Sequence, residues 1–401
     1  MAGCVTIRSS ANRETAPAVR ASTTTDVYAD LGLRRVINAS ATLTRLGGSI
    51  MPQPVVEAMI QASRSFVDLP ELQRRCGERL AKLTKNEAAY VSSGAAAGLT
   101  LTTAACITGT DPAKIARLPS NLDGLKNEVI IHRCQRNGYD FAVRQTGVKV
   151  VEIGFPGVTH PWELEAAITE RTAAVIYFAG GHFERGALPL RTTVEIAHKH
   201  GVPVIVDGAA QIPPVSNLWE YTTGAGADLA VFSGGKGLRG PQPSGLIVGR
   251  ADLVEAIRLN GPPNQAIGRP MKVGKEEMVG LVAAVEWYLI QDEPALLQRY
   301  ERQVQRVTEA VGNVAGVSAR RDFPSEAGQP MPRALLRFDP ERLGFDRDDV
   351  VRRLHEGDPY VEVANAGPDG IWINPQTLED GEEKIVIDRL LAALTPARGG
   401  R

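Results

Sequence analysis

Short apolar runs that alternate with helical segments constrain the fold of this chain more than any other feature of its 401 residues. One evident helix, residues 190–200, lies between the third run and the fourth, and Gly201 ends it. Runs of this length between helices are typical of parallel strands buried on both faces. We therefore predict an α/β domain with a mostly parallel sheet, with strands at residues 129–131, 148–153, 173–178, 202–206, 229–232 and 244–248.

The sequence changes character after about residue 268. Residues 275–312 are expected to form one long helix, or two helices joined near Pro294. The remainder is typical of a smaller α+β domain, with strand, helix, strand, strand and helix at residues 334–338, 348–355, 360–363, 370–373 and 382–394. The predicted organisation is a disordered tail (1–27), a segment that crosses to the small domain (28–45), a large α/β domain (46–268) and the small domain (269–401).

Charge and cysteine usage argue against several classes of protein. The chain has 45 Lys and Arg against 46 Asp and Glu, so it has no global field that would attract nucleic acid. No stretch of about 18 apolar residues is present to span a membrane. Four scattered cysteines, without a Cys-x-x-Cys pair or a metal-site spacing to histidine, favour reduced thiols and a cytoplasmic protein. For the first 25 residues, which have no secretory apolar core, an organelle transit peptide is the alternative to a tail.

Two polar side chains stand at the ends of neighbouring predicted strands. Asp207 ends one strand, and Lys236 comes just past the next in a glycine-rich turn. Because ligands bind at the carboxyl ends of strands in an open α/β sheet, we expect both side chains to face one crevice. A desolvated lysine is nucleophilic toward an aldehyde, and a buried aspartate keeps a pyridinium nitrogen protonated. The pair therefore predicts the anchors of pyridoxal 5′-phosphate, with the small Ala209 leaving room for the ring.

A cluster of small residues at 92–98 supplies the third requirement of that cofactor, a cradle for its phosphate. Ser92, Ser93, Gly94 and Ala95 precede an apolar helix, whose N-terminal N–H groups favour an anion. Each feature alone is also explained by a cap, a solvated loop or tight packing. Their order along the chain, each after a predicted strand, favours a cofactor site.

These motifs resemble those of fold-type I pyridoxal-phosphate enzymes of the selenocysteine synthase (L-seryl-tRNA selenium transferase)-like group. Within that group the nearest likeness is to D-glucosaminate-6-phosphate ammonia-lyase and related proteins. The matching stretches are residues 35–44, 92–97, 232–245 and 268–277, and Ala41 stands where the group's pattern has glycine. The resemblance implies the fold-type I transferase fold, with a sheet of the seven-stranded type beside the smaller domain.

The resemblance also implies roles for individual residues. Lys236 would form a Schiff base with the cofactor, Asp207 would pair with the pyridine nitrogen, and His132 would cover the ring; these three are the expected catalytic residues. The remaining expected cofactor contacts are Ser92, Ser93, Gly94, Ala95, Ala209, Ser233 and, from the junction between the domains, Arg269 and Lys272.

Substrate contacts are less constrained by the sequence. Arg133, Gln135 and His182 follow predicted strands and are candidates. The substrate carboxylate has no clear arginine motif; the strand at residues 334–338 offers Arg333 and Arg337, although a solvated strand edge explains them as well. Cys134 is expected to pack.

The expected reaction is α,β-elimination from a hydroxylated amino acid or amino sugar acid, which releases a 2-keto acid and ammonia. An aminotransferase, a racemase and an aldolase would use the same residues, so these alternatives stay open. A selenium transferase that acts on seryl-tRNA and a scaffold protein without turnover are further alternatives. By resemblance we expect a homodimer or a larger homo-oligomer.

Overall fold

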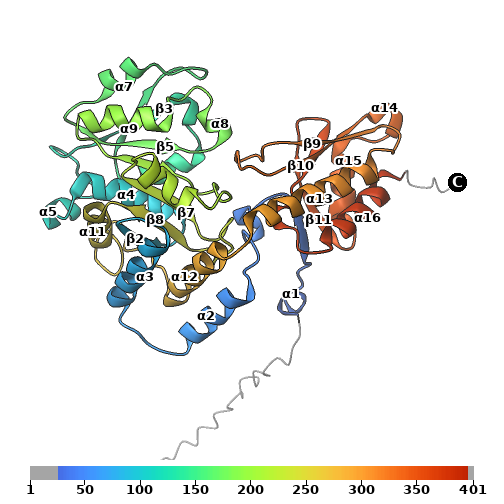
Figure 1. The fold of residues 1–401 in the computed structure, drawn as a ribbon, viewed down its shortest axis with the longest axis horizontal. Coiled ribbons are helices and arrows are strands. Elements are labelled where there is room, and N and C mark those ends of the chain that lie inside the picture. Colours follow the sequence, from blue (N-terminus) through green and yellow to red (C-terminus); the bar gives the residue numbers. More distant parts are fainter. Residues whose placement is uncertain (1–25, 396–401) are drawn as a thin grey trace, which may run out of the picture.

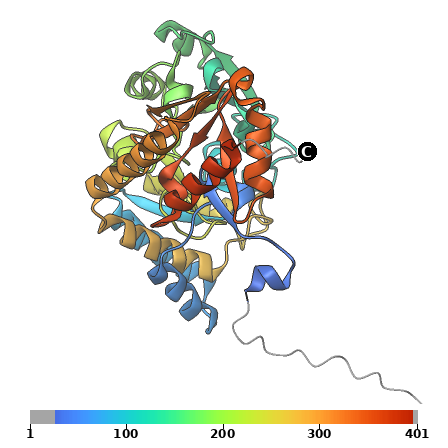
Figure 2. The ribbon, with the colours of Figure 1, turned by 90° about the vertical axis from the view of Figure 1, so that its right-hand side faces the viewer.

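Residues 26–395, which the computed structural model describes, are built around two sheets (Figure 1). A seven-stranded sheet lies in the larger lobe, and a five-stranded sheet lies in the smaller lobe with the C-terminal helices (Figure 2). Nearly all of the expected tail, residues 1–27, lies outside the described residues.

The larger sheet has the strand order β2-β8-β7-β6-β5-β3-β4. All neighbouring pairs from β7 to β4 are parallel, which confirms the predicted mostly parallel sheet. The run at residues 244–248 is instead antiparallel to both of its neighbours, because the chain returns from β7 through the loop at residues 234–244, which contains no crossover helix. The strands are β2 (Ala88–Ser92), β3 (Glu128–His132), β4 (Lys149–Ile153), β5 (Thr172–Phe178), β6 (Val204–Asp207), β7 (Leu229–Ser233) and β8 (Gly245–Gly249).

Helices cover both faces of this sheet because its central strands are apolar on both sides; every residue of β5, β6 and β8 is buried. The helices are α2 (Gln53–Ser63), α3 (Leu69–Leu83), α4 (Ala95–Thr108), α5 (Pro112–Ile115), α6 (Phe141–Arg144), α7 (Pro161–Ala167), α8 (Gly181–Glu184), α9 (Leu190–Lys199), α10 (Asn217–Trp219), α11 (Ala251–Asn260) and α12 (Lys275–Leu289). One face packs against α3, α7, α9 and α12, and the other packs against α4, α6 and α11.

The smaller sheet has the order β1-β11-β12-β10-β9. Its first strand comes from the N-terminal part of the chain and pairs in parallel with β11. Strand β9 was not expected, because it lies at the sheet edge, is largely exposed and has no apolar run. The elements are α1 (Val27–Asp30), β1 (Val36–Ala39), α13 (Glu293–Val311), β9 (Val317–Asp322), β10 (Arg333–Phe338), α14 (Pro340–Leu343), α15 (Arg347–Glu356), β11 (Tyr360–Asn365), β12 (Gly370–Ile373) and α16 (Glu382–Leu394).

Residues 275–312 form two helices, α12 and α13, and not one long helix; both possibilities were predicted. Helix α13 begins anew because the Asp292 carboxylate accepts a hydrogen bond from the Ala295 N–H at 3.0 Å. Helix α12 packs against α2 and α3, and its Leu281 and Val285 belong to the core of the larger sheet. The division into domains at residues 268 and 269 stays a prediction. Because α12 packs with the larger sheet, we propose a later boundary, between α12 and α13.

Candidate active site

The carboxyl ends of six strands, all except β8, meet at one edge of the larger sheet. Strand β2 runs in the same direction as β7, because both are antiparallel to β8, and Gly245 of β8 pairs with Ser92 on one side and Ser233 on the other. Asp207 pairs with Phe178 at the end of β5, and His132 ends β3 on the far side of β5. The topology thus brings Ser92, Ser233, Asp207 and His132 to the edge where α/β sheets bind ligands.

Close backbone packing fixes the turn that carries Lys236. A Cβ atom on Gly235 would lie 2.4 Å from Gln242 Cα, and one on Gly237 would lie 2.0 Å from the Ile212 carbonyl oxygen. Ser49 Oγ donates a hydrogen bond of 2.9 Å to the Gly235 carbonyl. The lysine therefore projects from a backbone that only glycine neighbours permit.

Burial shifts the pKa values of Lys236 and Asp207 in opposite directions. Asp207 is 8% exposed, and its Oδ1 accepts a hydrogen bond from the Ala209 N–H at 2.9 Å. Burial raises the pKa of Asp207, while the Ala209 N–H and the Lys236 charge oppose this shift. Burial lowers the pKa of Lys236, and the charges of Asp207 and Glu326 oppose that shift. A lysine whose pKa is lowered has more of the free amine that attacks a carbonyl.

His132 is a fully buried imidazole at the end of β3. Its two ring nitrogens have no hydrogen-bond partner among the described residues, and the ring meets Tyr177 edge-on, with the centroids 5.9 Å apart. Burial lowers the pKa of His132 to about 4. The ring is therefore neutral at physiological pH and has polar atoms free for a ligand.

The loop before α4 leaves backbone donors free. Ser92 is buried, and its hydroxyl donates to the Gly94 carbonyl at 2.9 Å, so this side chain holds the loop in shape. Gly94, with φ of 93°, is the N-cap of α4, and no side chain caps this helix. An uncapped helix N-terminus at the carboxyl edge of a sheet is a ready anion site.

The other expected cofactor contacts lie around the same edge. Ala209 and Ser233 are half-buried, and a backbone hydrogen bond of 3.3 Å from Ser233 to Ala209 joins the ends of β6 and β7. Ser93 Oγ donates to the Met271 carbonyl at 3.1 Å, which brings the 268–273 segment beside the α4 N-terminus. Within that segment Arg269 is half-buried and Lys272 is exposed.

Several candidates for substrate contact have other partners. Arg133 pairs with Glu152 at 3.2 Å, and buried Gln135 exchanges two hydrogen bonds with the Phe178 backbone. His182 is exposed and stacks on the adjacent Phe183. Arg337 pairs with Asp369 on the surface. Cys134, which was expected to pack, has its Sγ 3.7 Å from the Phe183 carbonyl oxygen.

Arg333 is not on a solvated strand edge, and that explanation was wrong. Its side chain is 7% exposed and pairs with Asp322 at 3.1 Å and with Glu326 at 3.3 Å. The guanidinium also lies 4.3 Å from the centroid of the Trp372 ring. A central position in the smaller sheet, between β9 and β12, explains this burial.

Two residues near Lys236 were not anticipated. The Tyr139 ring centroid lies 5.9 Å from the Lys236 ammonium, and the Glu326 charge acts on the same lysine. Tyr139 lies in a single 3-10 turn (Gly138–Asp140) and Glu326 in a loop, and neither segment has apolar periodicity, so only a tertiary arrangement could reveal them.

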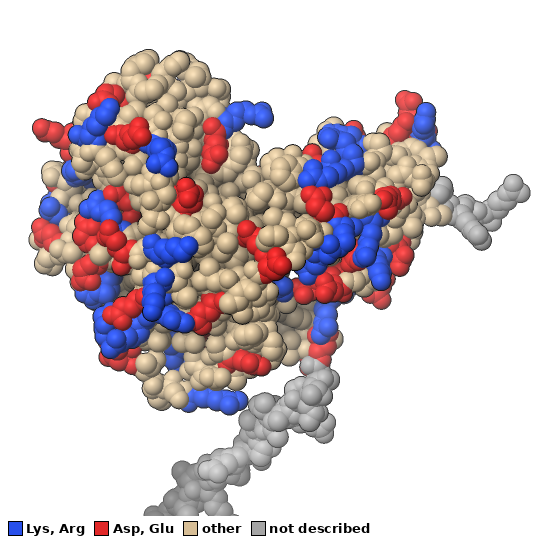
Figure 3. All heavy atoms as spheres, viewed as in Figure 1, with Lys and Arg blue, Asp and Glu red and all other residues tan. Residues whose placement is uncertain are grey.

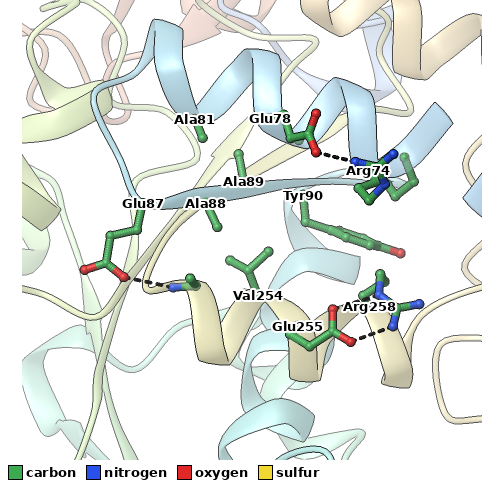
Figure 4. A pocket seen from close by; sticks show the side chains of 13 residues that line it. Arg74, Glu78, Ala81, Glu87, Ala88, Ala89, Tyr90, Val254, Glu255 and Arg258 are labelled. Atoms are coloured by element: carbon green, nitrogen blue, oxygen red, sulfur yellow. Dashed lines mark hydrogen bonds and ion pairs between the residues drawn. The ribbon is translucent and has the colours of Figure 1, made fainter. Parts of the chain in front are cut away.

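A separate hollow of about 180 Å³ lies along the outer edge of β2, between α3 and α11 (Figure 4). Its walls carry ion pairs of Arg74 with Glu78 and of Arg258 with Glu255, while Tyr90 and alanines form its floor. No lysine, cysteine or histidine lines it, so the Lys236 edge is the better candidate for catalysis.

Three further observations concern surface charge, membrane-spanning helices and metal sites. On the face seen in Figure 3, Lys and Arg side chains are interspersed with Asp and Glu, so this face has no continuous basic field. Within residues 26–395, none of the helices combines the length and apolar character that crossing a bilayer requires. The same residues contain no cluster of three or more acidic, histidine or cysteine side chains suited to a metal ion.

The sequence was compared with protein families and curated proteins. The family described as SelA: L-seryl-tRNA selenium transferase matches residues 36–307. D-glucosaminate-6-phosphate ammonia lyase of Salmonella typhimurium is 33% identical over 374 residues, 92% of this chain and 97% of that protein. 5′-C-glycyluridine monooxygenase-decarboxylase of a Streptomyces species is 35% identical over 386 residues, 93% of each chain.

Solved structures give a consistent comparison. The structure of D-glucosaminate-6-phosphate ammonia-lyase matches with a TM-score of 0.81 and 32% identity, over 93% of this chain and 99% of that one. Serine palmitoyltransferase from S. paucimobilis, solved with bound PLP, matches with a TM-score of 0.55 and 13% identity, over 89% and 86%. The second likeness concerns the fold alone, which is that of fold-type I pyridoxal-phosphate enzymes.

Proposed function

Because the chain belongs to the L-seryl-tRNA selenium transferase family, we propose that it is a pyridoxal 5′-phosphate-dependent lyase acting on a hydroxylated amino acid or amino sugar acid. The reaction would be α,β-elimination with release of a 2-keto acid and ammonia. The observation that carries the proposal is the pair of Asp207 and Lys236 at adjacent strand ends, each with a pKa shifted by burial.

Three features of the site fit this cofactor. The uncapped N-terminus of α4, with Ser93, Gly94 and Ala95, supplies donors for a phosphate. The ring nitrogens of His132 have no hydrogen-bond partner among the described residues, and Ala209 has only a small side chain at the neighbouring strand end. Further contacts to the phosphate side are proposed for Ser92, through its hold on the loop, and for Ser233, Arg269 and Lys272.

The bound cofactor would supply an electron sink for negative charge at the substrate Cα. The Lys236 amine would hold the cofactor covalently until the substrate amine displaces it. The freed amine would then take the Cα proton, since it projects from a rigid turn at the reacting edge. The Asp207 carboxylate would keep a proton on the ring nitrogen, and burial strengthens this interaction. The neutral His132 ring would cover one face of the cofactor and exclude water.

The names of the relatives support the substrate class. Glucosaminate, glycyluridine and a seryl group each have an amino-bearing carbon next to a carbon that carries oxygen. A β-hydroxyl is the leaving group that this elimination needs, so an amino acid with oxygen on Cβ is the proposed substrate class.

The cofactor is tested by spectroscopy and mass spectrometry. We expect purified protein supplemented with pyridoxal phosphate to absorb near the visible edge, and borohydride to leave a mass adduct on Lys236. Lys236→Ala should show neither, while the surface variant Lys199→Ala should behave as the wild type. Wild-type protein without an adduct on Lys236 would refute the proposal.

The reaction is tested with a panel of D- and L-amino acids and amino sugar acids. Equal amounts of keto acid and ammonia are expected from a β-hydroxy substrate. Transfer of the amino group to an added keto acid would instead identify an aminotransferase, change of handedness a racemase, and release of an aldehyde an aldolase. Retention of seryl-tRNA at low salt would favour the selenium transferase.

The 35% identity to a monooxygenase-decarboxylase favours one second candidate, an oxidative decarboxylase of an amino acid. Such an enzyme would consume dioxygen and release carbon dioxide, whereas the elimination neither consumes dioxygen nor releases carbon dioxide. Measuring oxygen uptake and carbon dioxide with the panel under air and under nitrogen distinguishes the two reactions.

A further inference from the structure

The loop between β9 and β10, residues 323–332, reaches from the smaller sheet to the strand ends of the larger one; we call it the roof loop. Gln211 Nε2 donates to the Ala327 carbonyl at 2.8 Å, and Gln329 Nε2 donates to the Ile212 carbonyl at 2.6 Å. Both Gln211 and Ile212 follow shortly after Asp207. The roof loop is therefore attached to the edge that carries the candidate active site.

The roof loop is also ordered internally. Ser325 is buried; its Oγ donates to Gln329 Oε1 at 3.0 Å and accepts from the Gln329 N–H at 3.2 Å. Gly328 has φ of 82°, and a Cβ there would lie 2.2 Å from the Gly181 nitrogen after β5. These contacts hold the loop in one conformation against the larger sheet.

Glu326 is the charged side chain of this loop that remains accessible. Its Oε2 receives hydrogen bonds from Arg333 Nη1 at 3.3 Å and from Asn374 Nδ2 at 3.1 Å. Its Oε1 receives only the longer contact of 3.4 Å from Asn374, and 42% of the side chain is exposed. One carboxylate oxygen is thus oriented by buried donors, and the other has room to accept a further hydrogen bond.

Contacts through Ile212 connect this carboxylate to the reacting lysine. The Ile212 carbonyl that accepts from Gln329 is the atom against which Gly237 packs, next to Lys236. In agreement with this path, the Glu326 charge opposes the lowering of the Lys236 pKa by burial. The loop contacts to the 211–212 segment and the effect of its charge on Lys236 therefore assign Glu326 to the surroundings of the lysine.

We propose that Glu326 is a specificity-determining residue, whose free carboxylate oxygen accepts a hydrogen bond from a hydroxyl on the substrate chain. This inference rests on the proposed function and deepens it. Arg333 and Asn374 act as positioning residues that orient the carboxylate. A charge-assisted hydrogen bond to this oxygen favours a substrate with a hydroxylated chain. An alkyl chain in the same place would displace water from the oxygen without replacing its hydrogen bond.

The test compares matched amino acids with and without hydroxyls: serine with alanine, threonine with 2-aminobutyrate, and D-glucosaminate with D-2-aminohexanoate. Dissociation constants are measured by calorimetry, and kcat/KM wherever turnover occurs. The wild type should prefer the hydroxylated member of at least one pair by about tenfold to a hundredfold, the range of a hydrogen bond to a charged group. Glu326→Gln should lose most of this preference and Glu326→Ala all of it, while affinity for the alkyl member stays within about twofold.

Two controls accompany the comparison. Glu301→Gln removes a glutamate of α13 that pairs with Arg321 at 2.6 Å and is similarly exposed, and it should keep the wild-type preference. The borohydride adduct on Lys236 shows that each variant is folded and loaded. Variants of Glu326 that keep the wild-type preference would overturn the inference, as would a wild type without any preference. A wild type that prefers hydroxylated ligands but releases no ammonia would refute the lyase and leave the role of Glu326 intact.

Discussion

At the scale of single residues, Asp207 and Lys236 are held close to one another by different means. Asp207 depends on a buried strand and one backbone N–H, whereas Lys236 depends on glycines that pack directly against other backbone. Burial disfavours both charges: it raises the pKa of Asp207 and lowers the pKa of Lys236. Each charge therefore supports the other, and removing one should change the titration of the other.

We predict that Asp207→Asn lowers kcat by about a hundredfold to a thousandfold, as the loss of an electrostatic contact in a buried site does. Asparagine keeps the shape of the side chain and can accept from the Ala209 N–H, so folding should persist. Because the Asp207 charge raises the pKa of Lys236, that pKa should fall in the variant, measured by the pH dependence of Lys236 acylation in cofactor-free protein. Asp252→Asn, at an exposed ion pair with Arg250, is the control. Unchanged kcat would contradict the role of Asp207.

The His132 ring predicts a pH-dependent stability. Its pKa is about 4 in the folded protein and about 6.5 in an unfolded chain, so the unfolded chain binds more protons between these values. Stability from this residue is therefore complete above about pH 6.5 and is lost as the pH falls towards 4, by up to about 3 kcal/mol. Urea unfolding of wild type and His132→Phe at about pH 7 and about pH 4.5 should show a smaller acid loss in the variant. His182→Phe, at an exposed position, should lose as much stability in acid as the wild type.

At the scale of elements, the candidate phosphate loop is shaped by two strands from different parts of the chain. Ser92 ends β2, and the antiparallel partner Gly245 begins β8 after the Lys236 turn. A Cβ on Gly245 would lie 2.5 Å from the Gly94 carbonyl carbon and 2.6 Å from Ser92 Oγ. The start of α4 is therefore coupled to the lysine turn through the close packing of Gly245 against Gly94 and Ser92.

Gly245→Ala should consequently displace the N-cap of α4. We expect the free energy of unfolding to fall by about 1–3 kcal/mol, because the added methyl group overpacks this contact. Affinity for pyridoxal phosphate should fall at least tenfold, with little change for pyridoxal, which has no phosphate; both are measured by absorbance titration. Gly157→Ala, where no atom lies within 4 Å of the added Cβ, should leave both quantities unchanged. Equal weakening of both ligands would argue against a phosphate role for this loop.

At the scale of the whole molecule, the two sheets are joined at the candidate active site. Strand β1 carries the N-terminal part of the chain into the smaller sheet, and the roof loop returns from that sheet to the strand ends of the larger one. Arg239, three residues after Lys236, pairs with Glu379 at 2.6 Å before α16. Movement of the smaller sheet would therefore displace residues at the candidate active site.

Exposed apolar side chains around the α2–α3 connection predict self-association. Ile60, Phe66, Val67 and Leu69 are exposed in the single chain, and such a cluster favours burial in an interface. Sedimentation should give a mass of at least twice the 43.0 kDa of one chain, and Phe66→Asp combined with Val67→Asp should shift it towards the monomer. Trp162→Asp, at an exposed position in α7, is the control and should keep the wild-type mass. A monomeric wild type would contradict the expected homo-oligomer.

Much of the larger sheet could be predicted because most of its strands are short apolar runs, which are visible in the local sequence. The runs at residues 173–178 and 202–206 correspond to β5 and β6, whose side chains are buried on both faces. Strand β9 was missed because an edge strand with exposed arginines has no such pattern. The burial of Arg333 could not be predicted either, since it depends on β12 and on the ring of Trp372.

The sequence by itself determined the α/β class and the positions of Asp207 and Lys236 after strands, because apolar periodicity and glycine turns are local properties of a chain. Membership of the family and the fold-type I architecture follow from the same residues. Only the tertiary structure decided which side chains face the lysine. Glu326 lies 90 positions away in an irregular loop, and its place depends on hydrogen bonds to the 211–212 segment and to Asn374. Contacts between irregular segments so distant in the chain leave no periodic trace, because they are set by how the two sheets pack and not by the conformation of either segment.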